Sequence, residues 1–103
     1  MDKTLNEYQD IARTTRLKSA DKEYARYNLA GEVGELLSLY AKSRRDAEDH
    51  TDKIAKELGD ILWHIAAIAD DHGWTLGYIA QLNLIKLSAR QKNGTITGSG
   101  DDR

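Results

Sequence analysis

The chain has 103 residues, with 15 basic and 17 acidic side chains and a formal net charge of −2. This near balance excludes a polybasic surface, so we expect no nucleic acid and no membrane among its partners. The length fits one domain with a modest core, which we expect to span residues 1–103. Cysteine is absent, which removes disulfides, thiolate catalysis and zinc–thiolate sites.

No apolar stretch is long enough to cross a membrane or to resemble a signal peptide. The longest, from Ile61 to Ala69, is interrupted by His64. We therefore expect a cytoplasmic protein.

Helices are expected throughout the ordered part, because proline is absent and apolar residues recur at steps of three and four. A first amphipathic helix is predicted over about residues 4–18, with Leu5, Tyr8, Ile11 and Ala12 on its apolar face. A longer second helix is predicted over about residues 21–44, with Asp21 as its N-cap.

The polar stretch 46–50 is predicted to turn the chain into a third helix capped by Thr51 or Asp52. Apolar residues along that helix predict one buried stripe: Ile54, Leu58, Ile61, Leu62, Ile65 and Ile68. Gly73 is predicted to end this helix.

Thr75 is predicted to cap a fourth helix, and residues 92–103 form a glycine-rich tail without helical periodicity. The pattern as a whole predicts an all-α, four-helix bundle-like domain.

Two pairs of acids carry the clearest chemical signal. Glu32 and Glu35 lie three residues apart on the second helix, and Glu57 and Asp60 lie three residues apart on the third. Residues at i and i+3 share a helix face, so antiparallel packing of the two helices would bring all four carboxylates together. The same spacing also arises by chance on the exposed face of a charged helix, and this alternative stays open.

Converging carboxylates repel one another unless a cation compensates them. An all-oxygen ligand set without sulfur favours Mg²⁺, with Mn²⁺ as a substitute, and Mg²⁺ commonly takes phosphate oxygens as further ligands. Three glycines lie beside these acids at a cost to helix stability, for which close helix approach or room for metal and phosphates are two explanations: Gly31, Gly34 and Gly59.

At these residues the sequence resembles the MazG-type nucleoside triphosphate pyrophosphohydrolases of the all-α NTP pyrophosphatase superfamily. The family pattern of Glu-x-x-Glu on one helix and Glu-x-x-Asp on the next is filled in order by Glu32, Glu35, Glu57 and Asp60. The resemblance implies that these four residues are the catalytic metal ligands. It implies Mg²⁺-dependent hydrolysis of (deoxy)nucleoside triphosphates to the monophosphate and pyrophosphate in nucleotide-pool control.

A segment of the fourth helix is similar to the family's Asn-x-x-Lys-Leu-x-x-Arg pattern, which implies that Asn83, Lys86 and Arg90 bind the nucleotide. The tail resembles the glycine-rich terminus of small single-domain members, including phage-encoded ones, which implies a bacterial or phage origin and a role over the substrate. Where the family often has a further acid before the first ligand, this chain has Gly31, which leaves the number of metal ions open.

Several nearby residues are interpreted as structural rather than functional. Tyr27 and Trp63 are expected to belong to the core, although either could stack on a base, and His64 is expected to be a satisfied core or interface histidine. Lys53 and Lys56 are interpreted as solvated rather than as counter-charges to the acids.

Helix faces on the second and third helices are too apolar for a monomer, so we expect a symmetric oligomer: the residues concerned are Leu36, Leu37, Leu39, Tyr40, Ile65 and Ile68. The resemblance implies a homodimer or a dimer-of-dimers tetramer in which a neighbouring chain completes the site.

The main alternative is a non-catalytic helical oligomerisation or interaction module with acids on its surface. A di-iron bundle is disfavoured because no histidine follows a glutamate by three residues. A nucleic-acid binder is disfavoured because no basic stripe is interleaved with aromatics.

Overall fold

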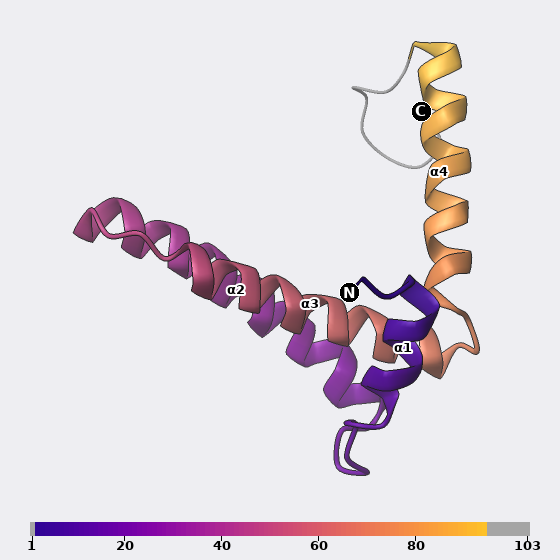
Figure 1. The fold of residues 1–103 in the computed structure, drawn as a ribbon, viewed down its shortest axis with the longest axis horizontal. Coiled ribbons are helices and arrows are strands. Elements are labelled where there is room, and N and C mark those ends of the chain that lie inside the picture. Colours follow the sequence, from indigo (N-terminus) through magenta and orange to yellow (C-terminus); the bar gives the residue numbers. More distant parts are fainter. Residues whose placement is uncertain (1, 95–103) are drawn as a thin grey trace.

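The computed structural model describes residues 2–94, which form four α-helices and no β-strand (Figure 1). The helices are α1 (Leu5–Arg13), α2 (Lys22–Asp46), α3 (Thr51–Asp71) and α4 (Leu76–Asn93). The all-α prediction and the four predicted helices are confirmed. Within the described part, no helix has the length and apolar character needed to cross a membrane. The predicted tail overlaps the last turn of α4, and its residues 95–103 lie outside the described part.

Three predicted helix boundaries are confirmed by their capping contacts. The Asp21 carboxylate accepts a hydrogen bond from the backbone N–H of Tyr24 at 2.9 Å, and the Thr75 hydroxyl accepts one from Tyr78 at 3.0 Å. Gly73 follows α3 with a φ of +75°, a left-handed conformation that glycine adopts without strain. These contacts satisfy helix-end groups that would otherwise lack partners.

The predicted cap of α3 is wrong. Thr51 is already the first helical residue, and His50 before it makes no capping contact through its side chain. The carboxylate of Asp49 accepts hydrogen bonds from both the backbone N–H and the hydroxyl of Thr51. An acid two residues before the helix therefore serves the N–H of its first residue, whereas a cap at Thr51 or Asp52 would have served an N–H two or three residues further along.

Helix α1 ends earlier than predicted, at Arg13. The hydroxyl of Thr14 donates to the carbonyl of Ile11 at 2.6 Å, and that of Thr15 donates to Ala12 at 2.7 Å. Threonine hydroxyls compete in this way for backbone carbonyls, and two in a row favour the end of a helix.

Helices α2 and α3 form a long antiparallel hairpin, and the other two helices meet it near one end (Figure 1). Helix α1 packs on α3, whereas α4 contacts α1 and α3 near its own start and then projects away from the hairpin. The radius of gyration is 16.3 Å, against about 13 Å for a compact domain of this length. The predicted bundle is therefore not closed within one chain.

The core is small and rich in alanine. Ala66, Ala69 and Leu76 form its buried centre, at the junction of α3 and α4. The buried stripe predicted for α3 is only partly correct for a single chain, since Ile54, Ile61, Leu62 and Ile68 are partly buried but Leu58 is 51% exposed and Ile65 is 38% exposed. With α1 short and α4 turned away, this chain has too few helices over the hairpin to cover its large apolar residues.

A buried glutamine joins α1 to the start of α4. The Gln9 amide nitrogen donates to the Asp70 carboxylate at 2.8 Å and to the carbonyl of Trp74 at 3.0 Å, and its oxygen accepts from the backbone N–H of Leu76 at 2.7 Å. The predicted apolar face of α1 is partly wrong, because Ile11 is exposed while Gln9 is buried. A polar residue is buried here because every group of its amide has a partner.

Arg16 holds the connector between α1 and α2 against α3. Its guanidinium pairs with the Asp71 carboxylate at 2.9 and 3.1 Å and donates to the carbonyls of Ala20 at 2.6 Å and Ala67 at 3.3 Å. Such a bidentate pair fixes both distance and orientation. The connector therefore lies at a defined position beside the end of the hairpin where α2 begins and α3 ends.

Candidate functional site

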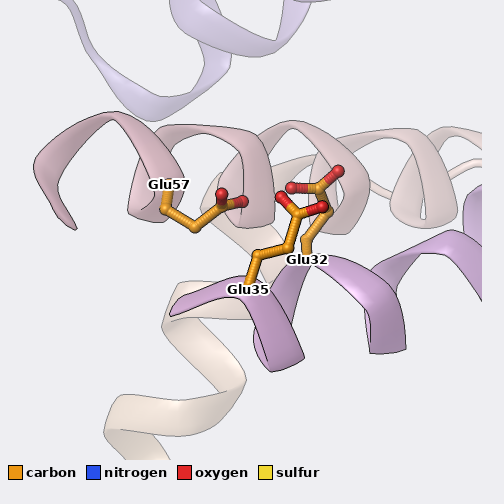
Figure 2. Close-up of side chains that lie close together, drawn as sticks. All are labelled: Glu32, Glu35 and Glu57. Carbon is orange, nitrogen blue, oxygen red and sulfur yellow. The ribbon is translucent and has the colours of Figure 1, made fainter. Parts of the chain in front are cut away.

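Three of the four predicted carboxylates meet between the two long helices (Figure 2). Glu32 and Glu35 come from α2 and Glu57 comes from α3, and one oxygen from each lies within 4.8 Å of those from the others. Their i, i+3 and antiparallel arrangement is the one that the sequence predicted. We call Glu32, Glu35 and Glu57 the acid cluster.

No ion pair among the described residues involves the carboxylates of the acid cluster. One oxygen of Glu32 and one of Glu57 are buried without a hydrogen-bond donor, and Glu57 as a whole is 9% exposed. Contact with Glu32, together with burial, raises the pKa of Glu57 above its usual range. Contact with Glu57 likewise raises the pKa of Glu35. Like charges held this close are costly in the ionised state.

The donor set fits a hard divalent cation. All three side chains offer carboxylate oxygens, and the two buried oxygens without donors are the atoms that a cation would satisfy. No sulfur or imidazole belongs to the acid cluster, so its chemistry matches Mg²⁺ or Mn²⁺ better than zinc.

Asp60, the fourth predicted ligand, lies one turn after Glu57 on α3 but is not part of the group within 4.8 Å. Its negative charge contributes to the raised pKa of Glu35 and of Glu57, so it lies within electrostatic reach of both. It also lines the two cavities that border the acid cluster.

The glycines beside the acids are not needed for close packing of the helices in this chain. A methyl group built at Gly31, Gly34 or Gly59 meets no atom within 4 Å. Close approach of the helices within one chain therefore does not explain why these positions are glycine. That the glycines leave room for metal and phosphates stays a prediction.

The first cavity has a volume of about 410 Å³ and carries aromatic side chains. Tyr24, Trp63 and His64 line it together with Glu32 and Asp60 of the acidic set. No lysine or arginine contributes to its wall. Its size falls in the range of small-molecule sites, and its aromatic walls suit a flat, uncharged group.

His64 is a satisfied buried histidine, as predicted. Its Nδ1 lies 2.8 Å from the backbone carbonyl of Asp60, and its Nε2 lies 3.1 Å from the side-chain nitrogen of Asn28. The predicted core role of Trp63 is incomplete, because its indole N–H donates to Thr15 at 2.8 Å and its ring also faces the cavity. Tyr27 is 75% exposed, so its predicted core role is wrong within one chain.

The second cavity has a volume of about 470 Å³ and carries lysines. Lys42 from α2 and Lys53 and Lys56 from α3 line it together with Glu35 and Glu57. The lysines are exposed, in agreement with the solvated interpretation of Lys53 and Lys56, yet they face the same space as the acids. That space combines ammonium groups with carboxylates.

Two of these cavity residues, Tyr24 and Lys42, were interpreted from the sequence as an apolar contact and as part of a basic helix end, not as site residues. Tyr24 precedes Glu32 by eight residues, and Lys42 follows Glu35 by seven. Both spacings are close to two helical turns, so they place each residue on the face that carries the acids. Extending the i, i+3 argument along α2 would have found them.

The predicted nucleotide-binding residues of α4 are not brought to the acid cluster within one chain. Asn83, Lys86 and Arg90 lie on the helix that projects from the hairpin, and none of them lines either cavity. Asn83 and Lys86 are exposed, whereas Arg90 is buried.

Known proteins are similar to this chain over the region that forms the site. The family described as MazG nucleotide pyrophosphohydrolase domain matches residues 20–95, which include the whole hairpin. The chain is also 36% identical over 85 residues to the Gene 37 protein of Mycobacterium phage L5, a match that covers 78% of this chain and 75% of the relative. No solved structure matches the chain. The chain therefore belongs to the MazG nucleotide pyrophosphohydrolase family.

Proposed function

We propose that this protein hydrolyses (deoxy)nucleoside triphosphates to the nucleoside monophosphate and pyrophosphate, in a reaction that depends on Mg²⁺ and accepts Mn²⁺ as a substitute. The observation that carries the proposal is the acid cluster, whose buried oxygens lack donors, in a chain of the MazG family. A bound cation would relieve the repulsion in such a site, and a polyphosphate would supply the remaining oxygen ligands. We place the activity in nucleotide-pool control in the cytoplasm.

In this proposal Glu32, Glu35, Glu57 and Asp60 hold the metal and are the catalytic residues. Bound Mg²⁺ would neutralise charge on the phosphate oxygens and lower the pKa of a ligated water. With the metal held, the water oxygen would bond to a phosphorus of the α–β linkage while the bond from that phosphorus to the bridging oxygen breaks. The bridging oxygen would keep the electron pair, and the proton lost by the water would pass to a free carboxylate oxygen and then to solvent.

The proposal extends to a second copy of the chain. Exposed apolar residues on α4 support an oligomer: Tyr78, Leu82, Leu84 and Ile85. A homodimer or a dimer-of-dimers tetramer could bring α4 of one protomer to the hairpin of its partner. Asn83, Lys86 and Arg90 would then bind the nucleotide across the interface.

The test is release of pyrophosphate and monophosphate from a panel of ribo- and deoxynucleoside triphosphates, with Mg²⁺, with Mn²⁺ and with excess chelator. We expect equal amounts of both products with either metal and none with chelator. Absence of both products from every nucleotide would overturn the proposal and favour a non-catalytic helical interaction module.

A further inference from the structure

The acid cluster lies between two cavities of different chemistry. The first carries Tyr24, Trp63 and His64 and no lysine or arginine, whereas the second carries three lysines and no aromatic residue. Glu32 lines the first cavity and Glu35 the second, so the acid cluster borders both. A ligand with one flat end and one polyanionic end therefore fits this surface in one direction only.

The residue types follow a matching order along the two helices of the hairpin. Along α3 it is lysine, carboxylate, aromatic: Lys53, Lys56, Glu57, Asp60, Trp63 and His64. Along α2 it is reversed: Tyr24, Glu32, Glu35 and Lys42. Because the helices are antiparallel, groups of each kind lie opposite one another (Figure 1). The α3 series spans about 16 Å at 1.5 Å per residue, a length comparable with that of an extended nucleoside triphosphate.

The first cavity, which we call the aromatic cavity, is preformed. Both ring nitrogens of His64 are engaged, and the ring stacks beside Tyr24 at 6.0 Å and meets Trp63 edge-on at 5.0 Å between centroids. Arg16 fixes the connector that forms the opposite wall through its bonds to Asp71 and Ala20. Aromatic side chains that are already held in place can stack on a nucleobase, and no binding free energy is then spent on reordering them. Phosphates are disfavoured here, because among the described residues the charged side chains in the wall are the acids Glu32 and Asp60.

The second cavity, which we call the lysine cavity, favours phosphates. Lys42, Lys53 and Lys56 approach it from both helices, as point charges suited to phosphate oxygens. In the free protein the carboxylates of the same cavity offset these charges. Once a cation occupies the acid cluster, the lysines are left as uncompensated positive charge at this end.

We propose that the substrate lies along the α2–α3 hairpin with its base in the aromatic cavity and its β- and γ-phosphates among Lys42, Lys53 and Lys56. These lysines bind the pyrophosphate that leaves, and the monophosphate stays on the side of Tyr24 and Trp63. This inference rests on the proposed function and adds a direction and three binding residues to it.

Two product-binding measurements test the direction. Trp63 and Trp74 are the two tryptophans of the chain, and Trp74 lines neither cavity. In a Trp74→Phe background, quenching of Trp63 fluorescence reports nucleoside monophosphate binding. Inhibition of turnover by pyrophosphate, and isothermal titration with Mg²⁺-pyrophosphate, report the other end.

We expect the double variant Lys42→Gln, Lys53→Gln to weaken pyrophosphate binding at least about tenfold and to leave monophosphate binding within about twofold. Tyr24→Leu should do the reverse. Lys22→Gln, an exposed lysine at the start of α2 that lines neither cavity, should change neither constant. Circular dichroism checks that all variants remain helical.

Unchanged pyrophosphate binding in the lysine variant, or a loss confined to monophosphate binding, would overturn the direction while leaving the proposed function intact. Failure of the proposed function has a different signature, because the wild-type protein would then release no product from any nucleotide. In that case the two titrations on wild-type and variant proteins still decide whether the two ends bind as inferred.

Discussion

At the residue scale, the dominant electrostatic feature is the mutual repulsion of Glu32, Glu35 and Glu57. A lysine or arginine beside them would relieve it, but no ion pair in the described part of the chain involves these carboxylates, and two of their oxygens have no donor. The arrangement costs the free protein stability that a bound cation would return. Replacing one acid should therefore affect folding and activity in opposite directions.

The first prediction concerns Glu57→Gln. The metal-free variant should melt at the same temperature as the wild type or higher, since the change removes one of the repelling charges and supplies an amide donor. Activity should fall by more than the roughly 10–100-fold that loss of a residue supporting a metal ligand costs. Thermal melts with and without Mg²⁺, together with product release, measure both effects.

Glu48→Gln is the matched control for this substitution, because Glu48 is exposed in the α2–α3 loop away from the acid cluster. It should keep the activity and the Mg²⁺-dependent rise in melting temperature, which Glu57→Gln should lose. Retained turnover in Glu57→Gln would show that Glu57 is not a metal ligand.

The second prediction is an unusual pH dependence of stability. The pKa values of Glu35 and Glu57 are raised in the folded protein, so that state binds protons more readily than the unfolded chain at these positions. The unfavourable interaction is present above the folded pKa and is relieved as the pH falls toward the unfolded value of about 4.3. The contribution of these two groups to stability should therefore rise as the pH is lowered from neutral toward the unfolded pKa.

Other acids move the other way, so the measurement compares wild-type protein with Glu57→Gln. The stability of the wild type relative to the variant should improve as the pH falls without metal. With saturating Mg²⁺ the trend should reverse, because protons then compete with the metal for the same oxygens. A difference between the two proteins that does not vary with pH would contradict the coupling between these carboxyls.

The carboxylates were predictable from the sequence because they depend on local helical geometry. Spacing places Glu32 beside Glu35, and the antiparallel hairpin brings Glu57 to them. The buried amide of Gln9 was not predictable, because its partners come from residues 61 to 67 positions further along the chain. Only the fold brings a donor and two acceptors to one glutamine.

At the element scale, the position of the α1–α2 connector depends on Arg16 and Asp71. Their side chains are 15% and 13% exposed, which makes this ion pair the most buried one in the described residues. Breaking a pair of this kind leaves a charge without its partner in a poorly solvated place. The connector also forms a wall of the aromatic cavity, so stability and ligand binding should change together.

The third prediction is that Asp71→Asn lowers the free energy of unfolding by about 2–4 kcal/mol, between the values for a charged hydrogen bond and for a buried pair. Monophosphate binding in the aromatic cavity should weaken as well. Asp46→Asn provides the control, because Asp46 pairs with Arg45 on the surface and its loss should leave the unfolding curve nearly unchanged. Urea denaturation measures both variants, and equal effects of the two would contradict the role given to Arg16.

The fourth prediction concerns Gly59. A methyl group at this position meets nothing within 4 Å, so Gly59→Ala should raise the free energy of unfolding by about 0.5–1 kcal/mol. A fall in turnover would support the prediction that this glycine leaves room for metal and phosphates, and unchanged turnover would contradict it.

Gly77→Ala serves as the contrast, since a methyl group there would lie 2.9 Å from the Asn6 side-chain oxygen that accepts a hydrogen bond from Gly77. We expect no stabilisation from it. Lower stability of Gly59→Ala would indicate a packing role for this glycine after all.

Helix starts could be predicted where a single side chain decides them, as at Asp21 and Thr75. The early end of α1 was missed because threonines such as Thr14 and Thr15 are also found inside helices. Only the structure shows that their hydroxyls donate to backbone carbonyls of the preceding turn. The direction of α4 was not predictable either. It depends on the left-handed Gly73 and on the contacts of Gln9 with Trp74 and Leu76.

At the scale of the whole molecule, large apolar side chains remain outside the core. Leu37, Tyr40 and Leu58 on the hairpin are each more than half exposed, and α4 adds Leu84 and Ile85. Exposed large apolar side chains in this number support an interface with another chain. The sequence predicted an intermolecular face from Leu37 and Tyr40, but it placed Leu58 in the buried stripe of α3, because periodicity alone does not distinguish burial within a chain from burial between chains.

The fifth prediction is that the active site is shared between protomers, and mixing two inactive variants tests it. Glu57→Gln keeps an intact α4 but damages the acid cluster, whereas Lys86→Gln keeps the acid cluster but damages α4. If the acids of one chain work with α4 of its partner, a mixed dimer contains one site with both parts intact. Unfolding and refolding a 1:1 mixture should then give about a quarter of the wild-type activity per chain, since about half of the dimers are mixed and each has one working site. Light scattering should show a dimer or tetramer of the 11.6 kDa chain.

Activity of the mixture equal to the average of the two separate variants would instead mean that each chain uses its own α4 or none, and the exposed residues of that helix would then need a different explanation.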